Sequence, residues 1–361
     1  MAEKKKKARR LKKILLISAI IIIAIVTTGW IIIANTVRPP EVPAIVIVNP
    51  EILISLEQDN PNTSQQSSQS SGNTPNEATP PPQMVQFEER RPMFFTFLIF
   101  GLTEGLNANT IMVAAYDAEA GQGYLISIPR DTLVDVNRRS RKIVSSYPAG
   151  RLHGGGHEGG VEQIRYEVST LIGFRPDFYI RIDYEAFIRL VDAVGGVEIY
   201  VPFHMQYKDP YQDLYINLQA GLQVLDGEDA LRFARYRMGI PGISPNISDY
   251  QRIEHQQQVL TAVFRRLLTP SSILRIPEFI SIFNEHVYSD LTTGELLWFA
   301  NQARTIGGIE ALSLYTLPMA GTSGAPSWYE WADEQGILEL VNRTINPLVR
   351  DITAKDLRII R

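Results

Sequence analysis

The chain has 361 residues, of which 45% are hydrophobic and 20% charged, so it is too long for one minimal domain and too apolar for a disordered protein. Eight of the 35 basic side chains but only one of the 39 acidic ones lie in residues 1–13. The overall net charge of -4 therefore conceals a net charge of -11 on the rest of the chain, the body. That acidic body argues against nucleic-acid binding, and the lack of cysteine excludes disulfides, thiolate metal sites and a cysteine nucleophile.

Residues 14–34 follow the basic tip of residues 1–13 and carry no charge. A helix of this length spans the hydrocarbon layer of roughly 30 Å. The alternative is a cleaved secretory signal, but the stretch exceeds a signal core of about 7–15 residues, and Thr36-Val37-Arg38 is a poor cleavage site. Because the basic residues come first, we predict a single-pass transmembrane helix in the cytoplasmic membrane, with the N-terminus inside and the C-terminal domain extracytoplasmic.

Residues 35–91 are predicted to form an extracytoplasmic linker. Residues 58–83 contain no bulky hydrophobic side chain, so they cannot offset the entropy of ordering and are expected to form a disordered stalk. Residues 44–56 before them are apolar. They are either a strand that docks on the body or a membrane-proximal segment.

From residue 92 onward, strand and helix periodicities alternate, which predicts an α/β fold with three α/β/α layers and a central mixed sheet. Residues 92–320 are predicted to be the main domain, with residues 321–361 as a C-terminal extension packed on it. The predicted strands are residues 94–100, 110–116, 124–128, 178–182 and 197–201. The predicted helices are residues 160–173, 184–194, 226–237 with Asp226 as cap, and 248–268 with Ser248 and Gln251 as a capping box.

The stretch Ser127–Thr132 is the first candidate for chemistry. Pro129 cannot continue a strand ladder, so Arg130 and Asp131 are delivered at the end of the strand. In open α/β sheets ligands bind at that edge. The alternative is a surface Arg–Asp pair.

A second candidate lies on two consecutive predicted helices. Its members are Arg232, Arg235 and Arg237 at one helix end, and Asp249, Arg252 and Gln256 at spacings of three and four residues on the next. Guanidinium groups this dense repel one another unless an anion binds them or acids neutralise them. Their planar forks suit bidentate capture of phosphate oxygens. The alternative is an amphipathic helix with solvated arginines.

At these residues the chain resembles the LytR–CpsA–Psr family of cell-envelope proteins, over roughly residues 94–320. The resemblance rests on four ordered motifs: Ser127–Thr132 (S-I-P-R-D-T), Val191–Val197 (V-D-A-V-G-G-V), Leu225–Arg237 and Asp249–Gln257. The anchor and stalk also match the family layout.

The resemblance implies an enzyme that transfers anionic glycopolymers from a polyprenyl-pyrophosphate carrier to peptidoglycan or another envelope acceptor, with no nucleic-acid partner. An acceptor hydroxyl would attack a phosphoryl group and release polyprenyl phosphate. By resemblance, the catalytic residues are Arg130, Asp131, Arg235, Arg237, Asp249 and Arg252. The pyrophosphate would be bound by Arg130, Arg235, Arg237, Arg252, Gln256 and Lys142.

The resemblance also implies a Mg²⁺ cofactor held by two aspartates, and here the chain departs from the family. Thr103 and Asn109 stand at those positions, and Glu104 is the only nearby carboxylate. Thr and Asn offer oxygen atoms to a hard cation but bring no charge. A further departure is His255, which stands where the family has an arginine and is expected to contact phosphate only if protonated.

His153-Gly154-Gly155-Gly156-His157 has the i, i+4 spacing of a metal-binding pair. Three glycines make a helix there improbable, so a loop at the rim of the site is favoured over a metal site.

Three functions therefore remain in competition. The favoured hypothesis is the anchored phosphotransferase. A non-catalytic protein that binds polyprenyl phosphate or an anionic glycan is the main alternative, because the metal-binding carboxylates are missing. Direct regulation of transcription is disfavoured by the predicted extracellular body.

Overall fold

The computed structural model describes residues 37–42, 88–103, 106–269, 275–302, 307–324 and 327–360. The basic tip (1–13), the transmembrane helix (14–34) and the disordered stalk (58–83) predicted from the sequence lie outside the described residues, as does Glu104. Within the described ranges, no helix is both long enough and apolar enough to cross a bilayer.

The chain divides into two compact units. The smaller comprises residues 1–41 and 291–304, and its described part includes α10 (Thr293–Gln302). The Thr292 hydroxyl accepts a hydrogen bond from the Glu295 backbone, and the Glu295 carboxylate accepts one from the Thr292 backbone, so this pair caps α10. The larger unit comprises residues 42–290 and 305–361 and holds the elements described below.

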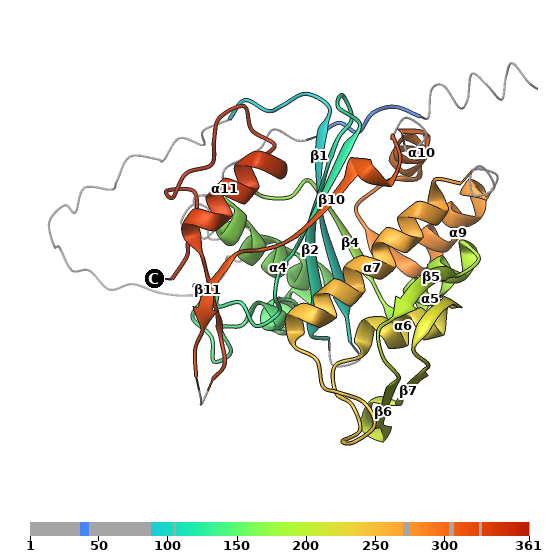
Figure 1. Ribbon diagram of the computed structural model, residues 1–361. Helices are drawn as coiled ribbons and strands as arrows, with labels where there is room; N and C mark the ends of the chain where they lie inside the picture. The colour runs from blue at the N-terminus through green and yellow to red at the C-terminus, as the bar shows by residue number, and fades with distance from the viewer. Residues whose placement is uncertain are drawn as a thin grey trace, which may run out of the picture. The chain divides into compact units, whose positions relative to one another are not determined.

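A six-stranded sheet forms the centre of the larger unit, in the order β10-β3-β2-β1-β4-β9 (Figure 1). β1 runs parallel to β4 and β10 parallel to β3, whereas the other pairs are antiparallel. The predicted α/β class with a central mixed sheet is therefore confirmed. The strands are β1 (Phe94–Leu102), β2 (Ala108–Asp117), β3 (Gln122–Ser127), β4 (Phe178–Ile182), β9 (Val287–Ser289) and β10 (Leu312–Thr316).

One face of this sheet packs on α4 (Gly156–Ile172) and α11 (Glu334–Thr344). Side chains alternate between the faces of a strand, so Leu98 and Phe100 of β1 enter this core together with Val113 of β2. Short helices lead into α4 and precede β10: η1 (Ile143–Ser145), α3 (Ser146–Gly150), η2 (Arg151–Gly155) and η4 (Ile309–Ala311).

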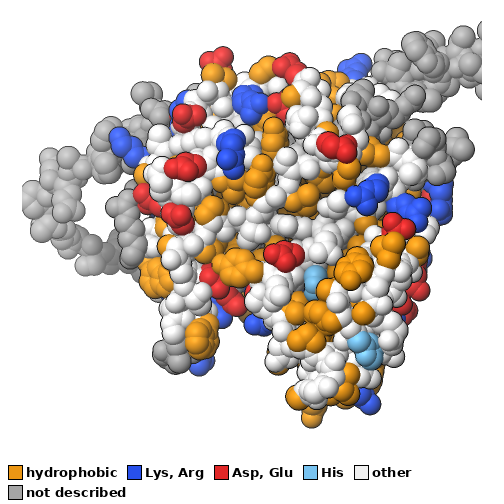
Figure 2. Space-filling model, viewed as in Figure 1, with side chains coloured by type: hydrophobic (Ala, Val, Ile, Leu, Met, Phe, Trp, Pro, Cys, Tyr) orange, Lys and Arg blue, Asp and Glu red, His pale blue; other side chains and the backbone are white. Residues whose placement is uncertain are grey.

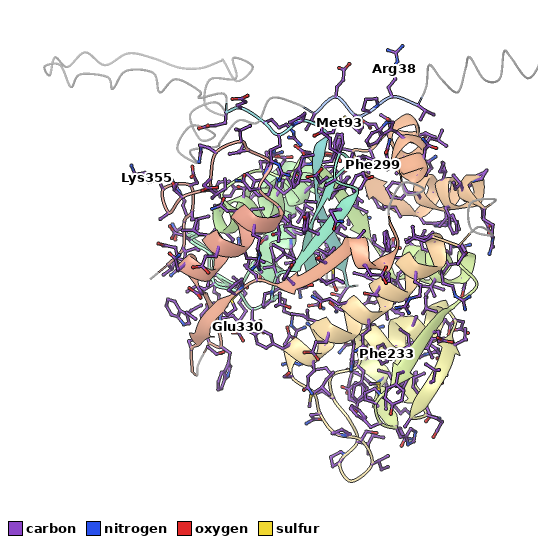
Figure 3. The ribbon with its side chains drawn as sticks, turned by 45° about the horizontal axis from the view of Figure 1, so that its top comes forward. Arg38, Met93, Phe233, Phe299, Glu330 and Lys355 are labelled. Atoms are coloured by element: carbon purple, nitrogen blue, oxygen red, sulfur yellow. The ribbon has the colours of Figure 1, made fainter. Side chains whose placement is uncertain are left out.

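A second core lies among the helices α5 (Tyr184–Ala193), α6 (Gly227–Arg235) and α7 (Asp249–Leu267) and two hairpins. Phe233, labelled in Figure 3, and Tyr236 are fully buried in it. One hairpin pairs β5 (Val197–Val201) with β8 (Gly221–Leu225); the other pairs β6 (Met205–Asp209) with β7 (Leu214–Leu218) through η3 (Pro210–Gln212), and α9 (Ile276–His286) follows α7.

The predicted caps are present. Asp226 accepts a hydrogen bond at the start of α6, and Ser248 and Gln251 form the capping box of α7. The predicted end of α6 at Arg237 is wrong. The helix ends at Arg235, because Tyr236 adopts an extended backbone (φ -58°, ψ 129°) and buries its ring in the second core. Arg237 therefore lies on an extended segment after the helix.

The histidine-containing loop also differs from the prediction. η2 is irregular, but α4 already begins at Gly156, so His157 lies in its first turn. The Nδ1 atom of His157 is 2.9 Å from the hydroxyl of the buried Tyr147. His153 is exposed, so the two imidazoles do not form a pair.

After β10, the chain forms a ribbon of β11 (Met319–Thr322) and β12 (Glu330–Ala332) and then α11. Ile337 and Val341 of α11 and Ile345 after it are fully buried in the same core as α4.

Candidate functional site

A cavity of about 320 Å³ opens beside the carboxyl ends of β1 and β4. Its walls come from β1, β2, α5, α6, α7 and the β6–β7 hairpin. Ligands of open α/β sheets bind at such an edge, because the strand ends present side chains and backbone groups that the sheet leaves unused. The apolar wall consists of Ile99, Met112, Ile182, Phe187, Leu214, Leu231, Val259 and Leu260.

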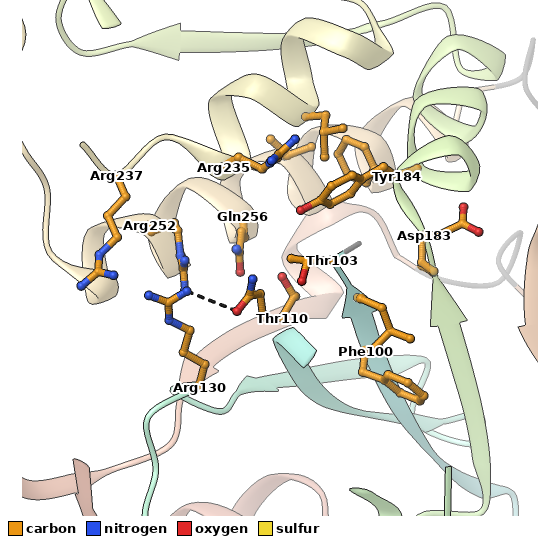
Figure 4. A pocket seen from close by; sticks show the side chains of 18 of the residues that line it. Phe100, Thr103, Thr110, Arg130, Asp183, Tyr184, Arg235, Arg237, Arg252 and Gln256 are labelled. Carbon is orange, nitrogen blue, oxygen red and sulfur yellow. Dashed lines mark hydrogen bonds between the residues drawn. The ribbon is translucent and has the colours of Figure 1, made fainter. Parts of the chain in front are cut away.

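Four arginines and a glutamine line the polar part of the same cavity: Arg130, Arg235, Arg237, Arg252 and Gln256. Figure 4 shows Arg130, Arg237 and Arg252 together on one side, with Gln256 next to them and Arg235 near Tyr184. Pro129 ends the strand before Arg130, α6 and the segment after it supply Arg235 and Arg237, and α7 supplies the other two. The tertiary structure thus brings together side chains from three predicted motifs.

Asp249 stands between two of these cations. Its Oδ1 atom lies 2.7 Å from Nη2 of Arg252 and 3.5 Å from Nε of Arg130. The Arg252 side chain is only 8% exposed, and this burial, with the nearby Arg130 and Arg237, lowers its pKa to about 10. Arg252 is therefore protonated at neutral pH, and part of the positive charge is already compensated.

Asp131 and Lys142 form a neighbouring ion pair, with 2.8 Å between Oδ1 and Nζ. Asp131 also lies 4.0 Å from Nε of Arg130. Neither Asp131, Lys142 nor Asp249 belongs to the cavity wall. These three residues surround the arginines, and their predicted contacts with substrate stay predictions.

Arg235 and Arg237 are the uncompensated cations. Among the described residues no carboxylate pairs with either of them, and the Arg235 guanidinium stacks on the Tyr184 ring at 4.4 Å. Arg232, by contrast, binds Glu228 and Asp229 on the solvent side of α6. Acids thus neutralise Arg232, Arg252 and part of the charge of Arg130, whereas the two arginines without acid partners leave positive charge for an anion.

The positions expected to hold Mg²⁺ carry only neutral oxygen donors, those of Thr103 and Asn109, among the described residues. Thr103 and Asn109 both line the cavity, but the Oδ1 atom of Asn109 accepts a hydrogen bond from Arg130 at 3.2 Å (Figure 4). A divalent cation there would have neutral ligands and a guanidinium for a neighbour, and no cluster of three His, Asp or Glu side chains suits a metal within the described ranges. The described residues do not fit the family's metal.

His255 does not meet the condition for phosphate contact, which was that it be protonated. Its ring stacks on Phe233 at 4.4 Å, is 6% exposed and does not line the cavity. Burial lowers its pKa from 6.5 to about 4, so it is neutral at physiological pH.

Tyr184 is a site residue that the sequence did not single out. It follows Asp183, the N-cap of α5, directly after β4. The signal that would have found it is its place at the end of the strand parallel to β1, next to the predicted strand-end site. The β6–β7 hairpin, which supplies Tyr207 and Gln212 to the wall, carried no such signal.

The profile of the LytR_cpsA_psr family matches residues 60–345. The chain belongs to this family. Among curated relatives, the polyisoprenyl-teichoic acid–peptidoglycan teichoic acid transferase TagV of Bacillus subtilis is 25% identical, with 70% of this chain and 63% of the relative covered. Cell wall biosynthesis protein LcpA of Corynebacterium glutamicum is 28% identical (64% and 46%) and Biofilm regulatory protein A of Streptococcus mutans 21% identical (73% and 66%). The chain thus covers less than two-thirds of each relative.

Solved structures share the fold. The crystal structure of Bacillus subtilis TagV aligns with a TM-score of 0.57 at 22% identity, covering 70% of this chain and 96% of that one. The structure of TagT bound to LIIa-WTA aligns with a TM-score of 0.54 at 19% identity, covering 71% and 91%.

Proposed function

We propose that the protein is a membrane-anchored extracytoplasmic phosphotransferase that moves an anionic glycopolymer from a polyprenyl-pyrophosphate carrier to a cell-wall acceptor. The observation that carries this proposal is the group of four arginines at one end of an apolar cavity. A ligand that fits both parts has a hydrophobic chain joined to a compact multivalent anion. A polyprenyl pyrophosphate has this composition.

In this proposal Arg235 and Arg237 bind the pyrophosphate oxygens most directly, because no described carboxylate competes for them. Arg130 and Arg252 contribute charge that Asp249 partly balances, and Gln256 donates a neutral hydrogen bond. Phosphoryl transfer depends mainly on positioning and on stabilising negative charge, so an arginine cluster supplies its main requirement.

An acceptor hydroxyl oxygen forms a bond to the phosphorus atom that carries the glycopolymer. The bond from that phosphorus to the bridging oxygen breaks, and polyprenyl phosphate leaves. The hydroxyl proton passes to the departing phosphate oxygen and from there to water, because the second pKa of a phosphate monoester lies near 6. The product is a phosphodiester between the glycopolymer and the acceptor.

The names of the relatives support this proposal. TagV is named as a transferase from a polyisoprenyl carrier to peptidoglycan, and TagT has been solved with LIIa-WTA. We extend the donor and acceptor classes to this chain as a proposal because its cavity has the apolar and cationic parts that such a donor needs.

We further propose that residues 14–34 anchor the protein, from their lack of charge and the basic residues before them. In cells, the protein should stay in the membrane fraction after alkaline carbonate extraction. Protease added outside should digest the body. Release by carbonate, or protection from the external protease, would contradict this topology.

A non-catalytic lipid-binding protein is the second candidate. The neutral Thr103 and Asn109 favour it, because the carboxylates that would hold a metal in the family manner are replaced. This protein would hold the polyprenyl pyrophosphate in the same cavity without transferring its glycopolymer.

The deciding experiment uses the full chain in detergent with a synthetic polyprenyl-pyrophosphate saccharide and peptidoglycan fragments, and measures released polyprenyl phosphate. Turnover that is lost in Arg235→Ala and kept in Arg232→Ala supports the transferase. Tight binding without turnover, with or without Mg²⁺, would favour the binding protein. Activity gained by Thr103→Asp with Asn109→Asp would show that the metal site is needed and has been lost.

A further inference from the structure

The β11–β12 ribbon is attached to the segment that carries the strand-end motif. The backbone N–H of Glu330 donates to the carbonyl oxygen of Asp131 at 3.0 Å, and the N–H of Leu133 donates to the carbonyl oxygen of Glu330 at 2.9 Å. This pairing fixes the ribbon next to Arg130 and its neighbours. The C-terminal part of the chain therefore forms part of the surroundings of the site.

Three aromatic side chains, Tyr250, Trp328 and Tyr329, form what we call the aromatic rim. Tyr250 is 40% exposed and Trp328 is 60% exposed. The Tyr329 ring lies 5.9 Å from Nζ of Lys142. Tyr250 is the residue after Asp249 on α7, and Lys142 pairs with Asp131, so the rim lies near both ion pairs that surround the arginines.

A carboxylate lies within this rim. The Oε2 atom of Glu330 accepts hydrogen bonds from the hydroxyl of Tyr250 at 3.2 Å and from Thr322 at 3.1 Å. Burial and the nearby Glu330 raise the pKa of Tyr250 to about 12, so this hydroxyl keeps its proton. In the part of the chain that the structure describes, no cation pairs with Glu330, which leaves its other oxygen available as an acceptor.

The rim borders a recess. In the view of Figure 2 the surface is hollowed between the protrusion formed by the β11–β12 ribbon and the one formed by the β6–β7 hairpin, both labelled in Figure 1. Figure 3 places Glu330 at the ribbon, and its carboxylate is bonded to Tyr250 of α7. A ligand lying in the recess would contact the ribbon on one side.

We propose that the aromatic rim is a binding subsite for a neutral saccharide, which holds the acceptor glycan with a hydroxyl directed toward Arg130. This inference rests on the proposed transferase function. The C–H faces of a sugar ring carry partial positive charge and stack on the negative faces of aromatic rings. Sugar hydroxyls donate to the free oxygen of Glu330. Exposed Trp and Tyr residues gathered at a recess are typical of binding surfaces.

The charges on the rim favour a neutral ligand. Lys142 pairs with Asp131 and Arg130 lies 4.0 Å from it, so the charge of Asp131 is balanced, whereas Glu330 has no cation partner among the described residues. An anionic glycopolymer would be repelled at this position, while the arginines bind its phosphate. The neutral acceptor would thus bind at the rim and the anionic donor at the arginines.

Insertion into a lipid bilayer is the other use of an exposed tryptophan. Along the chain Trp328 lies between Ser327 and Tyr329, and the Ser323 hydroxyl donates to the carbonyl oxygen of Ser327. A bilayer-inserting tip needs several apolar side chains, and Trp328 is the large exposed apolar residue described at this tip. The polar surroundings favour the saccharide.

The test is a calorimetric titration of the protein in detergent with chitotetraose, a neutral β-1,4-linked N-acetylglucosamine tetramer. Trp328→Ala should weaken binding at least tenfold, and Trp328→Tyr should recover most of the affinity because it keeps a ring. Tyr200→Ala is the matched control, since Tyr200 is 64% exposed on β5 in a different hairpin. It should leave the affinity unchanged.

A second readout separates this inference from the proposed function. Binding of inorganic pyrophosphate should be the same in Trp328→Ala and the parent protein. If the protein transfers glycopolymer, the variant should raise KM for the acceptor and leave kcat within about twofold. If it transfers nothing, chitotetraose binding still tests the rim. Unchanged chitotetraose affinity in Trp328→Ala would overturn the proposal, as would a variant that loses only binding to anionic phospholipid vesicles.

Discussion

The guanidinium of Arg252 lies 2.7 Å from the carboxylate of Asp249, one turn earlier on α7, and Arg130 approaches the same oxygen from the end of β3 at 3.5 Å. One carboxylate thus joins two motifs that are separated by more than one hundred residues. A buried cation is costly without a partner, so Asp249 allows Arg252 to sit in the cavity wall before any anion binds.

Replacing Asp249 by Asn should therefore destabilise the ligand-free protein. Arg130 and Arg252 would repel each other without the shared acid, and we expect a loss of about 2 kcal/mol, or a fall in Tm of roughly 4–8 °C. Thermal unfolding measures this loss, and added pyrophosphate should restore more stability to the variant than to the parent. Asp131→Asn is the control with a smaller effect, because Asp131 is 28% exposed. An unchanged Tm for Asp249→Asn would contradict the shared-acid interpretation.

Arg235→Ala and Arg237→Ala should weaken ligand binding without destabilising the fold. Neither side chain has a described acid partner, so its removal leaves no buried charge uncompensated. Loss of one charge-stabilising donor typically costs 10²–10³-fold in rate, and we expect that order for transfer by each variant. Calorimetry with pyrophosphate and measured transfer rates test the loss of ligand binding. Thermal unfolding tests whether the stability of the fold is unchanged. Equal losses in Arg232→Ala would point to a general charge effect instead.

Pyrophosphate binding should not require a metal. Thr103 and Asn109 are neutral, and the oxygen of Asn109 already accepts a hydrogen bond from Arg130. Calorimetry in EDTA and in Mg²⁺ should give affinities within about twofold. The variant with Thr103→Asp and Asn109→Asp should acquire a Mn²⁺ signal in paramagnetic resonance that the parent lacks. A parent protein that loses pyrophosphate binding in EDTA would show that other residues hold a metal.

Stability should fall with acid between about pH 6.5 and 4, partly because of His255. Its folded pKa of about 4 lies below the unfolded value of 6.5, so the unfolded chain binds a proton first. The stabilisation is complete above pH 6.5, is lost as the pH falls toward 4, and is worth on the order of 3 kcal/mol. Burial also lowers the pKa of His157, which adds to the slope.

Urea unfolding at several pH values should therefore show a shallower slope for His255→Phe than for the parent, because phenylalanine keeps the stacking on Phe233 and cannot titrate. His204→Phe, at a half-buried histidine whose Nε2 lies 2.8 Å from Oδ1 of Asn217, is the control for replacing a histidine by phenylalanine. A parent slope retained by His255→Phe would mean that folding does not lower the pKa of His255.

Strands and caps were predictable because their causes are local. β4 and β5 have the predicted bounds, since their apolar runs are closed by turn residues next to them. Ser248 and Gln251 cap α7 because the hydrogen bonds involve residues three apart. The end of α6 was not predictable, because burial of Tyr236 in a distant core decides it.

The site also has some features with local causes and others that tertiary packing decides. Pro129 placed Arg130 at a strand end, and the spacing of Arg252 and Gln256 put both on one helical stripe, so these parts followed from the sequence. The burial of His255 against Phe233 and the position of Tyr184 under Arg235 did not. Each is a contact between different elements, which no periodicity records.

The sequence by itself determined which residue types are available. It has arginines at the matched motifs, no cysteine, an acidic body and an uncharged stretch after a basic tip, and it has neutral side chains at two positions where the family has acids. Only the tertiary structure decided which charges remain free. Arg232 and Arg237 are alike in sequence, yet Arg232 is neutralised on its own helix and Arg237 lines the cavity. Electrostatic compensation depends on distances of a few ångströms in three dimensions, and packing sets these distances.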